Sequence, residues 1–134
     1  MRRLLVAVAA TLSVGASVVG NQGETIATAD VKTFTDNNFA DGVLKSDVPV
    51  LVHFWAEWAL PSRRLEPTIK ALATEYAGKV TVGKLNIDEN ESIPSRFKIR
   101  TIPTVLIFKG GQVVESVAGL TSMEDLKKLL DKHI

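Results

Sequence analysis

The sequence predicts an α/β domain with a central mixed sheet flanked by helices. Two continuous apolar runs, at 50–55 and 104–108, are typical of strands buried on both faces. Segments with helical spacing of apolar residues alternate with strand-like segments throughout residues 30–134. Near the end, Gly110 and Gly111 favour a hairpin turn. The alternation predicts parallel strand pairing, and the hairpin adds an antiparallel edge to the sheet.

The first part of the domain is expected to form a strand, a helix and a second strand. A short strand at 31–34 opens it, and Thr35 and Asp36 offer an N-cap for the helix that follows. Apolar residues at helical spacing continue that helix to about Lys45. The first buried run comes next, and its single polar residue is His53.

The middle of the domain continues the alternation. A helix is expected from near Pro61 to Gly78, with Pro67 inside it as the site of a kink. A strand at 80–86, a short helix around 94–97 and the second buried run follow in that order. Each of these strands is therefore separated from the next by a helix.

The last part is the second strand of the hairpin, at 112–118, and a final helix. Thr121 and Glu124 have the spacing of a capping box, which predicts that the helix begins between them. Its apolar residues recur at helical spacing and are expected to face the core; they are Met123, Leu126, Leu129 and Leu130.

Composition limits the possible classes of function. The 134 residues suffice for one domain with a hydrophobic core. Sixteen basic and 15 acidic residues give a net charge of +1, which argues against a nucleic-acid partner. The chain has no cysteine, so it forms neither disulfides nor cysteine-bound metal clusters. Its two histidines, His53 and His133, have no ligand-spaced neighbours, and we predict no metal or other cofactor.

The first 20 residues differ from the rest of the chain. Two arginines precede an uncharged stretch at 4–20 that is rich in leucine, valine and alanine. This pattern is typical of a secretory signal peptide at 1–20, with an uncleaved N-terminal membrane anchor as the alternative. Residues 21–29 are polar and are expected to be a linker before the domain at 30–134. We therefore expect an exported protein, periplasmic or secreted, or one that contacts a membrane only through this segment.

Residues 30–134 contain four specific motifs: Phe-Trp-Ala-Glu-Trp at 54–58 with Pro61 and Pro67, Lys-Leu-Asn-Ile-Asp at 84–88, Arg-Thr-Ile-Pro-Thr at 100–104, and Lys-Gly-Gly at 109–111 with Gly119. Together these motifs resemble the thioredoxin family. The resemblance implies the thioredoxin fold and membership of a family of protein-disulfide oxidoreductases. It also implies a cis peptide bond before Pro103, a geometry that is cheap only before proline.

The chain departs from the family at the positions that carry its chemistry. By resemblance, Ala59 and Ser62 replace the two cysteines of Cys-Gly-Pro-Cys, Leu60 replaces the glycine, and His53 replaces a buried acid that helps move a proton. Dithiol exchange needs one thiolate to attack and a second thiol to resolve the mixed disulfide. Alanine has no nucleophile, and a serine hydroxyl cannot form a disulfide. We therefore expect a thioredoxin-like domain without its dithiol.

In the family, the cis-proline loop faces the active-site turn and pairs with the backbone of a bound peptide. The resemblance therefore implies a surface for an extended polypeptide or a partner protein. Its expected residues are Trp58, Leu60, Pro61, Ile102, Pro103 and Gly119. Leu120 would extend it as an exposed apolar patch, although Trp58 has packing within the domain as an alternative role.

The leading hypothesis is a redox-inactive, exported module that binds peptides or proteins, in the manner of a chaperone. One alternative is a thioredoxin whose dithiol was mutated away, but silencing it would not require the changes at His53 and Leu60. Another is a hydrolase in which His53 activates Ser62, for which no third group or oxyanion donor is identifiable. A structural subunit with an unused groove is also possible. If the protein is not a hydrolase, His53 is expected to be a neutral core histidine with one hydrogen bond.

Overall fold

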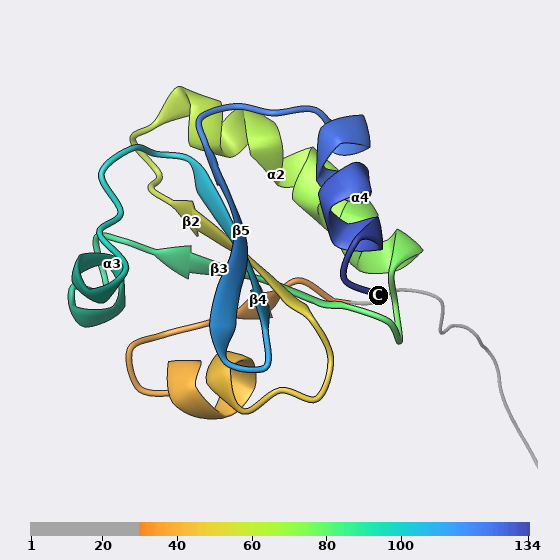
Figure 1. Cartoon of the computed structure of the whole chain (residues 1–134). Helices are drawn as coiled ribbons and strands as arrows, with labels where there is room; N and C mark the ends of the chain where they lie inside the picture. Colours follow the sequence, from red (N-terminus) through yellow and green to blue (C-terminus); the bar gives the residue numbers. More distant parts are fainter. Residues whose placement is uncertain (1–29) are drawn as a thin grey trace, which may run out of the picture.

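The computed structural model describes residues 30–134, which form a five-stranded sheet with helices on both faces (Figure 1). The strands are β1 (Lys32–Thr33), β2 (Val50–Trp55), β3 (Thr81–Asn86), β4 (Thr104–Lys109) and β5 (Gln112–Ala118). The helices are η2 (Ala40–Leu44), which is a short π-helical segment, α2 (Leu60–Glu75), α3 (Ser92–Arg96) and α4 (Met123–Asp131). The signal peptide or anchor expected at 1–20 and the linker expected at 21–29 lie outside the described residues.

The strand order is β1–β3–β2–β4–β5. The pairs of β3 with β1 and with β2 are parallel, whereas those of β4 with β2 and with β5 are antiparallel. The predicted α/β fold with a mixed sheet is therefore confirmed. The parallel pairing expected from the alternation holds for β1, β2 and β3 but is wrong for β4, which pairs antiparallel with β2. No helix in the described part of the chain is both long and apolar enough to span a lipid bilayer.

Strand β2 lies in the middle of the sheet and is buried along nearly its whole length. Its side chains alternate between the two faces. Val50, Val52 and Phe54 belong to one hydrophobic core, and Leu51 belongs to the other. His53 is two residues from Leu51 and therefore faces the same side of the sheet, toward α2.

The two cores have different compositions. Aliphatic residues of α2 and α4 fill the first, and Figure 1 shows these two helices side by side over the sheet. The second contains a cluster of aromatic rings contributed by the β1–η2 segment, the loop after α3, and β4. These rings are Phe34, Phe39, Phe97 and Phe108, with neighbouring centroids 5.2 to 6.3 Å apart, mostly in edge-on contact.

Helix α2 begins directly after the turn that follows β2. Its N-cap is Ala59, which offers no side-chain acceptor to the helix. Pro61 lies in the first turn, where the missing N–H has no helical partner in any case. Pro67 lies inside the helix, as expected. Helix α2 therefore begins where the turn ends, and Pro61 lies in its first turn, as the sequence indicated.

The segment between β1 and β2 differs from the expected helix. Thr35 and Asn38 each accept a backbone N–H hydrogen bond from the other, at 3.2 and 2.7 Å. Asp36 does not cap the helix expected in its own segment. Its carboxylate instead accepts hydrogen bonds from the backbone N–H groups of Ser92 and Ile93, at 3.1 and 2.9 Å. A turn therefore occupies the first part of the expected helix, and only η2 remains.

The N-cap of α4 is Ser122, so the capping box expected from Thr121 and Glu124 is wrong by one residue. The Ser122 hydroxyl accepts a hydrogen bond from the Asp125 N–H at 3.1 Å. Ser122 has the extended backbone conformation that an N-cap requires, with φ −88° and ψ 158°. The structure therefore uses the second of two adjacent hydroxyl residues to begin the helix.

Candidate functional site

Three chain segments meet at one edge of the sheet. Phe54 near the end of β2 pairs with Thr104 at the start of β4, and Thr104 pairs with Ala118 at the end of β5. The turn after β2, the Ile102–Pro103 loop before β4, and the Gly119–Leu120 segment after β5 are therefore neighbours. Figure 1 shows these three connections at the same end of the sheet. The topology thus brings together all the residues that were expected to bind a peptide.

The turn after β2 is closed by backbone hydrogen bonds around Ala59. The Ala59 N–H donates to the carbonyl of Ala56, and the Ala59 carbonyl accepts from the Arg63 N–H, each at 3.2 Å. The methyl group of Ala59 is buried, so it presents no surface to a ligand. Leu60 and Pro61, by contrast, are exposed on the outside of the turn.

The Ile102–Pro103 peptide bond is cis, which confirms the geometry expected for this loop. Pro103 is buried, and its carbonyl accepts a hydrogen bond from the Gly119 N–H at 2.7 Å. Ile102 is half-buried, and its backbone N–H and C=O groups bond to no other residue in the described part of the chain. These two groups are therefore available to another polypeptide backbone.

Large apolar side chains are concentrated at this edge. Three of the five exposed large hydrophobic residues in the described region lie here: Trp58 is 68% exposed, Leu60 60% and Leu120 54%. The Trp58 indole N–H donates to a carboxylate oxygen of Asp88 at 2.9 Å, so the ring is held at the surface and not packed into the core. We call Trp58, Leu60, Ile102 and Leu120 the turn surface.

Beneath the turn lie His53, 2% exposed, and Ser62, 1% exposed. Neither His53 Nε2 nor Ser62 Oγ has a hydrogen-bond partner among the described residues. A serine nucleophile needs a base in hydrogen-bond contact and access to its substrate. The structure shows neither, so it does not support the hydrolase alternative. The hydrogen bond expected at His53 is likewise not found at Nε2.

Burial decides the charge of His53. It lowers the pKa of the imidazole to about 4, while nearby Glu66 acts in the opposite direction and Lys84 reinforces the lowering. Lys84 pairs directly with His53 across β2 and β3. Its ammonium lies 3.5 Å from the Glu66 carboxylate and 5.0 Å from the centre of the Trp55 ring. His53 is therefore neutral at pH 7, and the counter-charge of Lys84 is the carboxylate of Glu66 on α2.

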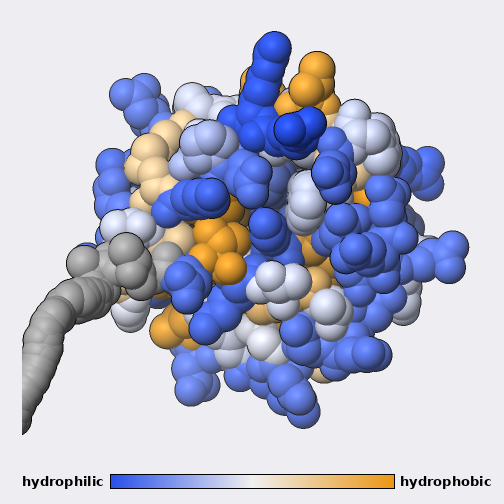
Figure 2. Space-filling model, turned by 180° about the vertical axis from the view of Figure 1, so that it is seen from behind, coloured by the Kyte–Doolittle hydropathy of each residue, from blue (hydrophilic) through white to orange (hydrophobic). Residues whose placement is uncertain are grey.

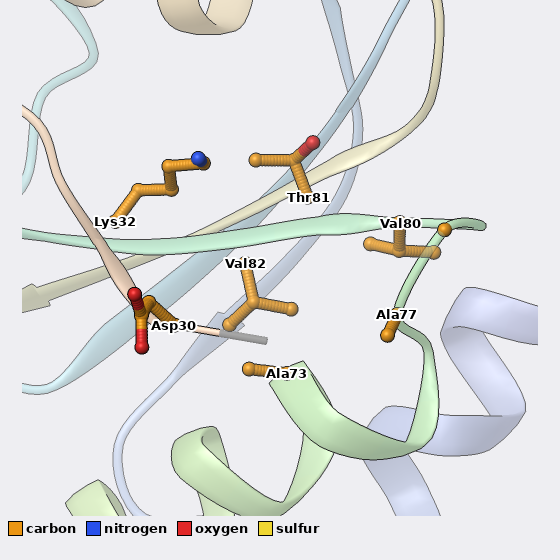
Figure 3. Close-up of a pocket in the computed structure, with 8 residues that line it drawn as sticks. Asp30, Lys32, Ala73, Ala77, Val80, Thr81 and Val82 are labelled. Carbon is orange, nitrogen blue, oxygen red and sulfur yellow. The ribbon is translucent and has the colours of Figure 1, made fainter. Parts of the chain in front are cut away.

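A pocket lies away from the turn surface. Its volume is about 220 Å³, and it lies at the opposite end of the sheet, between the end of α2 and the start of β3. Figure 3 shows Ala73, Ala77, Val80 and Val82 along its apolar side, with Asp30 nearby.

On the face drawn in Figure 2, hydrophobic residues form small areas separated by hydrophilic ones. Residues 30–134 hold no group of three or more histidines and carboxylates placed to bind a metal.

A mixed sheet whose β2–α2 turn neighbours a cis-proline loop defines a thioredoxin-like domain. The family profile described as Thioredoxin matches residues 30–132. The chain therefore belongs to the thioredoxin family.

Several curated thioredoxins are similar to the chain over most of its length. "Thioredoxin 1" of Nostoc sp. is 48% identical over 100 residues, which is 75% of this chain and 94% of the relative. The thioredoxin of Rickettsia bellii is 47% identical over 100 residues, covering 75% and 95%. That of Haemophilus influenzae is 39% identical over 106 residues, covering 79% and 99%.

Sequence reasoning missed the residues that support the site through long-range contacts. Asp88, which holds Trp58, lies 30 residues away from it, although it is the last residue of one of the four motifs. Glu66 and Lys84 are 18 residues apart and form the ion pair beside His53. The only signal for these three residues in the sequence was that they lie in segments that are otherwise apolar or that carry one of the four motifs.

We predict that acidification destabilises the fold through His53. The unfolded imidazole has a pKa of 6.5 and the folded one about 4, so the unfolded chain takes up the proton first. Within that window, His53 should remove about 1.4 kcal/mol of unfolding free energy per pH unit, and above it nothing. Urea unfolding at about pH 7 and about pH 5 measures this for wild type and His53→Val. Wild type should lose about 2 kcal/mol more than the variant; equal losses would contradict the prediction.

Proposed function

We propose that this protein binds extended polypeptides non-covalently at the turn surface. One observation carries the proposal: Trp58 and Leu60 are exposed beside the backbone N–H and C=O of Ile102, which bond to no other residue within 30–134, while the neighbouring positions Ala59 and Ser62 have no thiol. The apolar side chains offer burial, and the peptide groups offer directional hydrogen bonds.

An extended peptide would bind as an added strand. In this mode, main-chain hydrogen bonds supply affinity, and alternate side chains enter pockets. The N–H and C=O of Ile102 supply the main-chain contacts. Trp58, Leu60 and Leu120 then cover the apolar side chains of the peptide, with Pro61 and Gly119 at the border. The partner is therefore a flexible or unfolded segment, which matches a chaperone-like role.

The protein should show no disulfide reductase activity, because no residue supplies a thiolate. Reduction of insulin by dithiothreitol should proceed at the rate seen without protein. The double variant Ala59→Cys with Ser62→Cys should recover only part of a thioredoxin's activity, because His53 is neutral and Leu60 alters the turn. A wild-type rate above the background would refute redox inactivity. Full recovery in the double variant would favour a thioredoxin that lost only its dithiol.

Leu60→Gly should weaken peptide binding by roughly tenfold or more, because full burial of a leucine contributes about 1.5 to 3 kcal/mol. The probe is a capped synthetic peptide of alternating leucine and serine, measured by calorimetric titration. Ile134→Gly is the matched control, since Ile134 is also an exposed apolar residue but lies at the C-terminus, beyond α4. If Leu60→Gly and wild type bind with equal affinity, the binding site lies elsewhere.

We further propose that the protein is exported, or anchored facing outside the cytoplasm, on the basis of the composition of residues 1–20. Mass spectrometry of the mature protein should give a first residue near Ser17 or Asn21. An intact Met1 in the soluble fraction would contradict cleavage. An intact Met1 in the membrane fraction would instead identify the segment as an anchor.

A further inference from the structure

A basic groove lies next to the turn surface. Its volume is about 160 Å³, and it separates the segment after α3 from the ends of β4 and β5. Lys98, Arg100 and Thr101 line it on one side, and Thr104, Ser116 and Ala118 line it on the other. Thr101 directly precedes Ile102, whose backbone N–H and C=O bond to no other described residue. The groove therefore begins next to these two groups.

The groove carries positive charge without acidic partners. Lys98 and Arg100 line the groove and are exposed. Arg96, the last residue of α3, is also exposed, with its guanidinium over the Phe97 ring. None of them takes part in an ion pair within the described residues, whose pairs involve other cations. Elsewhere around the turn the charges are mixed, with exposed Glu57 and Asp88 near Trp58 and exposed Arg63 and Arg64 in the first turns of α2. Because the net charge of the chain is only +1, the pair of cations is a local property of the groove.

Lys98 holds an uncommon backbone conformation at the groove. With φ of 56°, it is the one non-glycine residue in the left-handed region among those described. It terminates α3: its N–H donates to the Ser95 carbonyl at 3.1 Å, and the next N–H, of Ile99, donates to the Pro94 carbonyl at 2.9 Å. Glycine is the usual residue at this point of such a motif. A lysine here places an ammonium at the groove against the local backbone preference, an outlier of the kind that points to function.

We propose that Lys98 and Arg100 bind an acidic side chain of the polypeptide held at the turn surface. This inference rests on the proposed function and names the partner class: extended segments in which aspartate or glutamate follows apolar residues. A strand paired with Ile102 continues past Thr101 toward the groove, and its alternate side chains point to one face. A carboxylate on that face would approach Lys98 and Arg100, which form no ion pair among the described residues. A lysine or arginine at the same place would be repelled.

Two capped synthetic peptides test the proposal. They share a core of alternating leucine and serine, and one ends in two glutamates where the other ends in two glutamines. In calorimetric titration at low salt, wild type should bind the glutamate peptide roughly threefold to tenfold more tightly. Added salt should reduce this preference, since screening weakens exposed ion pairs.

The variant Lys98→Gly with Arg100→Gln should bind the two peptides equally. Glycine suits the left-handed backbone at position 98, so its urea midpoint should not fall below that of wild type. Lys109→Gln, at the other end of β4, is the control and should keep the preference.

The outcomes separate this inference from the proposed function. If wild type shows no preference, or the double variant keeps it, the basic groove is not an acidic subsite, while binding at the turn surface stands. If wild type binds neither peptide, the proposed function fails together with the inference. Leu60→Gly should weaken both peptides by the same factor, because it acts on the shared apolar core.

Discussion

Burial of β2 on both faces is the constraint on which the rest of the structure depends. The strand pairs with β3 on one side and β4 on the other, and its side chains enter both cores. A shift of one residue in register would exchange Leu51 and His53 with Val50 and Val52, moving the imidazole into the aromatic core. The same register sets the turn after β2 against the cis-proline loop, so the candidate site follows from core packing.

The domain has the architecture of a thioredoxin, and its polar interior holds His53, Ser62 and an ion pair. The imidazole of His53 is neutral at pH 7, and the ammonium of Lys84 pairs with Glu66 on α2. Ser62 Oγ and His53 Nε2 are both buried without a hydrogen-bond partner among residues 30–134, which is costly for polar groups. The proposed peptide binding therefore depends on the exposed apolar side chains above this interior.

The sequence predicted what depends on short-range pattern. The strand at 50–55 was placed correctly because a short continuous apolar run is typical of a strand buried on both faces, and the hairpin followed from Gly110 and Gly111. Features that depend on distant partners were missed. Asp36 bonds to backbone groups 56 and 57 residues away and so leaves no cap for the expected helix. The basic groove was missed for the same reason, since α3, β4 and β5 come together only in the folded chain.

Under the proposed function, Ala59 would change how long a complex with a client lasts. A thioredoxin with two cysteines holds its client through a sulfur–sulfur bond until a second thiol cuts it, so the lifetime of that complex is set by chemistry. A client held only by Leu60 and Trp58 would leave by ordinary dissociation. Occupancy would then follow the concentration of the client by mass action, and release would require neither a reductant nor a second enzyme.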